Sequence, residues 1–216
     1  MIITKQKDFT DLLKILVPYQ KIFLIGCGDC AATCKTGGKD EVLKIKELLE
    51  KENKTITGFS VPDVVCTAAG VKTCFAQNRK AVEEADAILV FACGLGIQCV
   101  KENDRANKLV FPGNDTLCAA ILDAQGNFQE LCSACGECVL EFTGGICPVT
   151  RCSKGLLNGP CGGVSKGKCE VDAERDCAWV LIYQELEKKK LLEAFKKIHP
   201  AKDYSKTIKP RKITLN

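Results

Sequence analysis

Hydrophobic positions in the first 120 residues fall into short runs that alternate with stretches of helical periodicity. The short runs contain β-branched residues and are typical of strands buried on both faces. Strands that alternate with helices indicate a parallel α/β sheet. Helices are expected over 8–17, 40–50 and 78–85, and strands over 21–26, 55–61, 87–91 and 108–111. We therefore predict an α/β domain over residues 1–120, a small parallel sheet with flanking helices.

The pattern changes after about residue 131. Residues 132–177 hold eight cysteines and eight glycines, with almost no periodic apolar positions. Such a segment cannot build an ordinary core, so bound metal must supply much of its folding free energy. Apolar positions after Cys177 predict one long amphipathic helix that ends near Ile198. We divide the rest of the chain into a cysteine-rich region with this helix, 121–198, and an extended basic tail, 199–216, expected to reach away toward a partner.

Cysteine is the unusual feature of the composition, at 16 of 216 residues against one histidine. Secreted disulfide scaffolds reach this density, but they are short and begin with a signal peptide, whose apolar stretch this sequence lacks. The longest apolar run, 87–93, has seven residues, too few for a membrane span. We expect a cytoplasmic protein whose thiols bind metal. A net charge of +4 is too small to indicate nucleic acid.

A first group of cysteines follows the predicted strands. Cys27, Cys66 and Cys93 each come just after a strand, and the carboxyl ends of parallel strands meet at one edge of a sheet. Cys30 and Cys34 extend the first position into a Cys-x2-Cys-x3-Cys run. We predict a cluster site that takes four ligands from these five thiols. The plainer alternative is that they are buried structural cysteines.

The same loop permits a second interpretation. Residues 26–31 match the G-x-G-x-x-A fingerprint of a dinucleotide site. The acidic residue expected at the end of the second strand is not clear, because the chain continues with Ser60, Val61 and Pro62 before Asp63. Cysteine at two open positions of the loop suits a metal cluster better than a nucleotide.

A second group lies in the cysteine-rich region. Cys132, Cys135 and Cys138 form a Cys-x2-Cys-x2-Cys run, the spacing that wraps three corners of a cubane cluster, and Cys147 precedes a proline. The remaining thiols are Cys152, Cys161, Cys169 and Cys177. Eight thiols divide into two four-thiolate sites, each a [4Fe–4S] cluster or a structural zinc site, and spacing does not assign individual thiols. Disulfides are the remaining alternative. In total we expect two or three [4Fe–4S] clusters, with zinc possible.

Four segments resemble a known family. They read FTGGICPVTRCSKGLLNGPCGG (142–163), GKCEVD (167–172), CAWVLIY (177–183) and IGCGDCAATC (25–34). They are similar to the MetV family, the small iron–sulfur/zinc subunits of the acetogen-type methylenetetrahydrofolate reductases, which are related to the reductase-associated C-terminal cysteine-rich domain. Cys74, Cys99 and Cys118 lie outside the pattern.

The resemblance implies a heteromeric complex of one-carbon metabolism, in the Wood–Ljungdahl pathway. It implies a MetF-like flavoprotein partner that carries the flavin and the catalytic chemistry, and an upstream electron donor such as ferredoxin or a larger redox complex. This chain would be a non-catalytic electron-transfer subunit, and its sequence offers no acid–base constellation of its own. The alternative within the same family resemblance is a zinc-binding docking subunit without a redox role.

Overall fold

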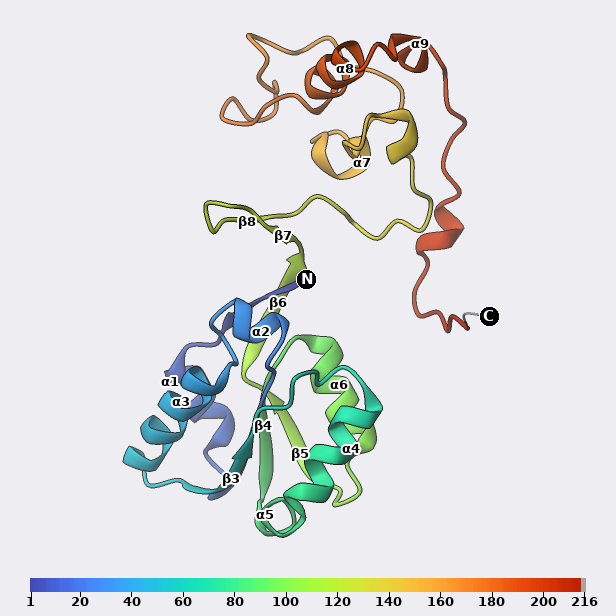
Figure 1. Cartoon of the computed structure of the whole chain (residues 1–216). Coiled ribbons are helices and arrows are strands. Elements are labelled where there is room, and N and C mark those ends of the chain that lie inside the picture. Colours follow the sequence, from blue (N-terminus) through green and yellow to red (C-terminus); the bar gives the residue numbers. More distant parts are fainter. Residues whose placement is uncertain (215–216) are drawn as a thin grey trace. The chain divides into compact units, whose positions relative to one another are not determined.

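The computed structural model describes residues 1–214, in which the chain forms two compact units. The first unit comprises residues 1–118 and the second residues 119–216. The last two residues of the predicted tail, 215 and 216, lie outside the described residues. Among residues 1–214, no helix combines the length and the apolar character needed to cross a membrane. Each unit is described below by itself (Figure 1).

The first unit is built on a parallel sheet of four strands. The strand order is β3-β2-β4-β5, and every neighbouring pair is parallel. The strands are β2 (Lys21–Gly26), β3 (Thr55–Ser60), β4 (Ala87–Phe91) and β5 (Leu109–Pro112). The predicted fold class and its four strands are thereby confirmed.

Helices cover both faces of this sheet (Figure 1). Strand β4 is buried along its whole length, with Leu89 and Phe91 in one apolar cluster and Ile88 and Val90 in the other. Burial on both faces explains why the strand is an uninterrupted apolar run. One face packs against α1 (Phe9–Leu16) and α3 (Lys39–Lys51), and the other against α4 (Ala68–Gln77), α5 (Arg79–Glu84) and α6 (Gly94–Asn103).

Several elements of the first unit were not predicted. Strand β1 (Ile2–Gln6) pairs with β6 (Asn114–Ala119) in a separate two-stranded sheet, and α2 (Cys30–Thr33) forms a single turn. Helices α4 and α6 were also missed, since glycine and cysteine interrupt their apolar periodicity. In α6, a side chain at Gly96 would approach the Cβ of Ala92 to 2.9 Å, so close packing on the end of β4 requires glycine there.

The second unit has little regular structure. Its apolar cluster contains three buried residues, Trp179, Ile182 and Leu186. Its elements are β7 (Ile121–Leu122), β8 (Phe128–Gln129), η1 (Leu140–Phe142), α7 (Pro148–Arg151), α8 (Ala178–Lys188), α9 (Leu192–Phe195) and η2 (Tyr204–Thr207). A core of this size stabilises a folded unit of nearly one hundred residues poorly.

The single long helix predicted after Cys177 is two helices in the structure. Helix α8 ends at Lys188, Lys190 adopts a left-handed conformation with φ of 57°, and α9 follows. Phe195 then packs edge-on against Trp179 and Tyr183, with ring centroids 5.8 and 5.7 Å away. Because α9 folds back onto α8, the apolar spacing continues through the break.

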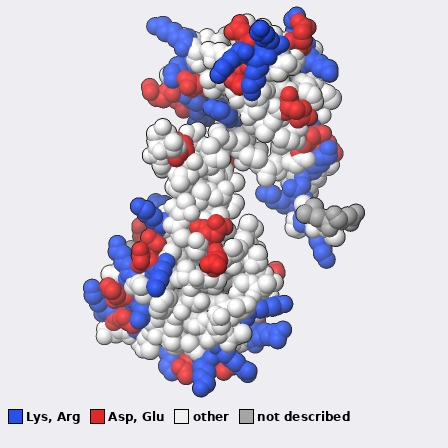
Figure 2. All heavy atoms as spheres, viewed as in Figure 1, with Lys and Arg blue, Asp and Glu red and all other residues white. Residues whose placement is uncertain are grey.

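The tail is also less extended than expected. It contains the short 3-10 helix η2, and Lys202 is buried with only 8% of its surface exposed. Basic side chains gather along this segment, whereas basic and acidic side chains intermingle over the rest of the visible face (Figure 2). The segment forms hydrogen bonds with Asn158 and Glu137 of the second unit through His199, Asp203 and Lys206. Binding of the tail to a partner stays a prediction.

Candidate functional site

The first candidate site lies at the carboxyl edge of the parallel sheet. The chain leaves β2 toward the face covered by α3, and it leaves β4 toward the face covered by α6, so these adjacent strands form a topological switch point. Gly26 and Phe91 are in register at their ends. Cys27 follows the first strand and Cys93 follows the second, so the fold places both beside the opening where ligands of such sheets bind.

Backbone hydrogen bonds hold the neighbouring loops against this edge. The amide of Cys27 donates to the carbonyl of Gly37 at 2.9 Å, which closes the loop after β2. The amide of Gly28 donates to the carbonyl of Pro62 at 2.8 Å, which ties this loop to the one after β3. Cys66 belongs to that second loop. Three loops that carry cysteines therefore meet at one edge.

The thiols at this edge interact electrostatically. Burial raises the pKa of Cys66, and the neighbouring Cys93 and Cys27 raise it further. Burial is also the main cause of the raised pKa of Cys30, while Cys27 and Asp29 add to it and the amide of Ile2 opposes it. Thiolates gathered in this way repel one another, and a bound cation would relieve that repulsion.

Strand β1 contributes to the same site. The amide of Ile2 donates to the sulfur of Cys30 at 3.4 Å, and the thiol of Cys34 donates to the carbonyl of Ile2 at 3.9 Å. Cys34 thus faces the backbone of β1. No sequence signal marked Ile2 as a neighbour of these thiols, because β1 and Cys30 are distant in the chain.

Cys99 also lies near this edge, although the sequence pattern excluded it. Burial raises the pKa of Cys99, and the next largest cause is the charge of Cys66. Cys74, also outside the pattern, is buried in the apolar cluster on the same face of the sheet. Cys118 is half-buried in β6. Of the three excluded thiols, Cys74 is part of the core and Cys99 adjoins the candidate site.

Gly37 is a position where the loop geometry can be tested. A Cβ at Gly37 would collide with the backbone carbonyl of Phe91 and lie 3.0 Å from the Cβ of Ala31. Gly37→Ala should therefore displace the loop that carries Cys27 and destabilise the first unit by about 1–3 kcal/mol, as overpacking does. Urea unfolding followed by circular dichroism measures the change.

Gly94→Ala is the matched control, because its Cβ would meet only the hydroxyl of Thr116 at 3.5 Å. That substitution should leave the unfolding midpoint nearly unchanged or raise it slightly. Equal midpoints for Gly37→Ala and the unsubstituted protein would contradict the account of this loop.

The second candidate site is a pocket in the second unit that four thiols line. They come from separate segments: Cys152 directly follows α7, and Cys177 directly precedes α8. Cys177 is held in place by a 2.8 Å hydrogen bond from its amide to the carbonyl of Gly167, and Cys169 by one of 2.9 Å to that of Arg175. The four thiols are Cys152, Cys161, Cys169 and Cys177.

Charged and polar side chains surround this thiol pocket. Lys154 forms an ion pair with Glu170, and Glu170 also accepts a hydrogen bond of 3.2 Å from the thiol of Cys161. The hydroxyl of Ser153, at 3.6 Å, is the main cause of a lowered pKa at Cys169. Lys154 lines the pocket with the thiols, and Cys161 and Cys169 raise its pKa, after the larger effect of Glu170. A cation beside clustered thiols favours their ionised, metal-binding form.

The Cys-x2-Cys-x2-Cys run forms a separate exposed loop. Cys132 and Cys138 are exposed and Cys135 is half-buried. A backbone hydrogen bond of Glu137 is the main cause of a lowered pKa at Cys135, and the ammonium of Lys202 lowers it further. Cys147 is the N-cap of α7, and its sulfur lies 3.7 Å from the hydroxyl of Thr150.

Within residues 1–214, no three Cys, His, Asp or Glu side chains converge as a ready metal-ligand set. The thiol pocket thus brings four sulfurs around one space without joining them at a common centre. The predicted site residues remain candidates.

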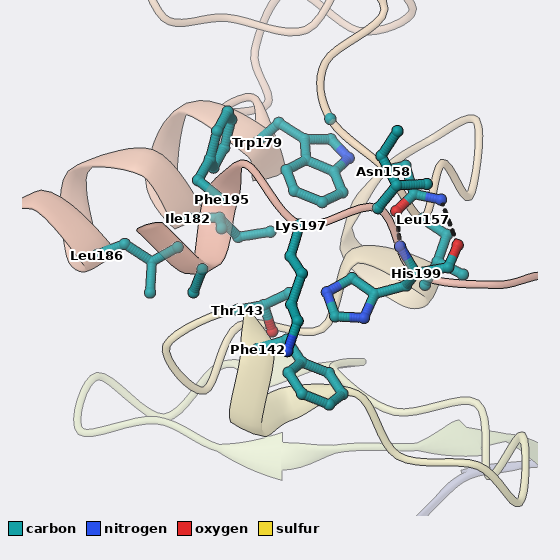
Figure 3. A pocket seen from close by; sticks show the side chains of 13 residues that line it. Phe142, Thr143, Leu157, Asn158, Trp179, Ile182, Leu186, Phe195, Lys197 and His199 are labelled. Atoms are coloured by element: carbon teal, nitrogen blue, oxygen red, sulfur yellow. Dashed lines mark hydrogen bonds between the residues drawn. The ribbon is translucent and has the colours of Figure 1, made fainter. Parts of the chain in front are cut away.

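A second cavity in the second unit is mainly apolar (Figure 3). Trp179, Ile182 and Phe195 line it, together with His199 at its edge. The side-chain amide of Asn158 donates to the carbonyl of His199, and its oxygen accepts from the amide of His199, both at 2.8 Å. The ring of His199 also packs on Phe142, with centroids 4.2 Å apart. This cavity therefore marks where the tail is fastened, as Figure 3 shows.

The chain thus combines a parallel α/β unit with a cysteine-rich unit that contains a four-thiol pocket. Residues 111–205 match the protein family described as "Methylene-tetrahydrofolate reductase C terminal". The match includes all eight cysteines of residues 132–177 and the first part of the tail, residues 199–205. This part of the chain is therefore similar to a domain associated with methylenetetrahydrofolate reductase. No curated protein and no solved structure matches the chain.

Proposed function

We propose that this chain is the MetV-type electron-transfer subunit of a methylenetetrahydrofolate reductase complex. In this proposal [4Fe–4S] clusters held by its cysteines pass electrons to a flavin on a MetF-like partner. The observation that carries the proposal is the four-thiol pocket inside the segment that matches the reductase family. The family match supports the reductase association, and the thiols support the metal.

The donor set of the pocket fits a four-thiolate metal group. Sulfur-only ligands select iron–sulfur clusters or zinc. Lys154 would compensate the negative charge of the bound group, and Glu170 would hold Lys154 in place. The thiols would move toward a common centre on binding, which suits a region whose apolar cluster has only three buried residues. We assign Cys152, Cys161, Cys169 and Cys177 to this site.

The assignment leaves four of the eight thiols for a second site. These are Cys132, Cys135, Cys138 and Cys147. The first unit would supply a third site, from Cys27, Cys30, Cys66 and Cys93, with Cys34 and Cys99 close by. Cys30 starts α2, Cys66 stands one residue before the N-cap of α4, and Cys93 is the N-cap of α6. Each of these three positions is therefore fixed by the start of a helix.

The partner follows from the chemistry of the reaction. A cluster transfers one electron at a time, whereas reduction of methylenetetrahydrofolate needs two, and a flavin converts between the two modes. The flavin and the folate site would lie on the MetF-like chain, and this chain would contribute only ligands, charge compensation and a docking surface. An upstream donor such as ferredoxin would reduce it.

The proposal is tested by strictly anaerobic purification, followed by metal analysis and electron paramagnetic resonance. The expected result is iron and sulfide for at least two clusters, with signals that appear on reduction. The reduced protein should then bleach the flavin of an added MetF-like flavoprotein. Zinc without iron would support the docking subunit instead, and metal-free protein would overturn both readings.

A further inference from the structure

The tail and the Cys132–Cys138 loop are in direct contact in the second unit. Glu137 receives three hydrogen bonds from the tail: Lys202 donates to its carbonyl, the amide of Asp203 to its carboxylate at 2.8 Å, and Lys206 to its carboxylate at 3.0 Å. The bond from Asp203 is the main cause of a lowered pKa at Glu137, and Lys206 adds to it. Glu137 of the loop thus accepts hydrogen bonds from three residues of the tail.

A glycine in the loop allows the tail to approach its backbone closely. Gly136 has a φ of +78°, a conformation that favours glycine. A Cβ there would also lie 3.0 Å from the carbonyl oxygen of Lys206 and 3.1 Å from its Cβ. Arg211 donates in turn to that same carbonyl. The tail therefore covers the turn between Cys135 and Cys138.

The tail is fastened at its other end as well. His199 exchanges two hydrogen bonds with Asn158 and packs on Phe142 (Figure 3). Residues 199–211 thus run from the edge of the apolar cavity to the cysteine loop. We call this segment the strap.

Lys202 is the residue of the strap with the most unusual environment. Its side chain is buried, and its ammonium donates to the carbonyl of Glu137, which also accepts a hydrogen bond of 3.5 Å from the thiol of Cys135. A buried ammonium is costly unless an anion or several acceptors surround it. The ammonium of Lys202 and the sulfur of Cys135 therefore meet at one backbone oxygen, and the carboxylate of Glu137 belongs to the same residue. No lysine is expected in such a place merely to keep a tail in solution.

We infer that the strap retains the Cys132–Cys138 loop and that Lys202 is a positioning residue of its metal site, fixing Cys135 and compensating the charge of the bound group. This inference rests on the proposed function for the identity of the site. Residues that support a metal ligand from outside its coordination sphere govern metal retention and electronic properties. A cation held against a sulfur ligand favours the more negative, reduced form of a cluster.

The test compares Lys202→Met, Lys202→Arg and Lys209→Met in the full-length chain. Lys209 is an exposed lysine of the same segment, so its substitution controls for net charge. Lys202→Met should lose the metal of the Cys132–Cys138 loop to a chelator about 10- to 100-fold faster than the unsubstituted protein, because residues outside the coordination sphere affect metal retention on this scale. The reduction potential of one cluster should fall while the others stay unchanged, and Lys202→Arg should restore most of both properties.

If Lys202→Met retains its metal and has the same reduction potentials as the unsubstituted protein, the inference is overturned. The proposed function is then unaffected. If the unsubstituted protein holds no metal, the proposed function fails. Hydrogen exchange then tests whether the strap retains the Cys132–Cys138 loop. Faster exchange of the amides of residues 133–138 in Lys202→Met than in Lys209→Met then supports retention of the loop. Equal exchange in the two variants overturns it.

Discussion

Cys161→Ala should unfold the second unit and leave the first unit folded. Cys161 is exposed, so its substitution creates no cavity, and an exposed residue of this kind ordinarily changes stability by less than about 0.5 kcal/mol. As a metal ligand it carries far more, because structural metal binding contributes about 10–16 kcal/mol in small domains. Amide hydrogen exchange on the anaerobic protein should show loss of protection in helix α8 and normal protection in the parallel sheet.

The matched control is Val164→Ala, which changes a partly exposed residue lining the same pocket and keeps all four thiols. It should retain both metal content and protection. Full protection of helix α8 in Cys161→Ala would show that the thiol pocket does not depend on metal, and it would withdraw the assignment of this site.

Cys66→Ala should have the opposite profile, losing metal without unfolding. Cys66 lies at the carboxyl edge of the sheet and outside the two apolar clusters that stabilise the first unit. Removing this ligand should therefore abolish the metal of the first unit and leave its thermal transition within a few degrees of the original. Metal analysis and calorimetry on one anaerobic sample measure both properties.

Cys74→Ala provides the comparison, since Cys74 lies on the buried face of α4 and is not a predicted ligand. It should keep the metal but lower stability by about 1 kcal/mol, the ordinary cost of a point substitution. If Cys66→Ala retains all of its metal, Cys66 is not a ligand of the first site.

The strands of the sheet could be predicted because burial on both faces requires an uninterrupted run of apolar residues. Runs such as Ala87–Phe91 have no polar position to serve either face, so their apolar character is unbroken. Strand β1 carries no such signal, because its sheet partner β6 lies more than one hundred residues away. The break near Lys190 was equally hidden, since two helices packed on each other keep the same apolar spacing as one.

The thiols of the sites were visible in the sequence, but their grouping was not. Spacing marks Cys132, Cys135 and Cys138 as neighbours because short loops force them together. Successive thiols of the pocket are eight or nine positions apart, and hydrogen bonds such as that from the amide of Cys177 to the carbonyl of Gly167 decide their placement. Lys202 was counted only as one charge of a basic tail, because burial of a lysine depends on long-range contacts.

Trp179 gives the protein an internal optical reporter. It is the single tryptophan of the chain, and it lines both the thiol pocket and the apolar cavity of the second unit, where its indole donates to the carbonyl of Leu156 at 3.0 Å. Indole fluorescence of the full-length protein therefore arises from one place. Changes in that emission follow the second unit alone, even while the first unit stays intact and silent at the same wavelength.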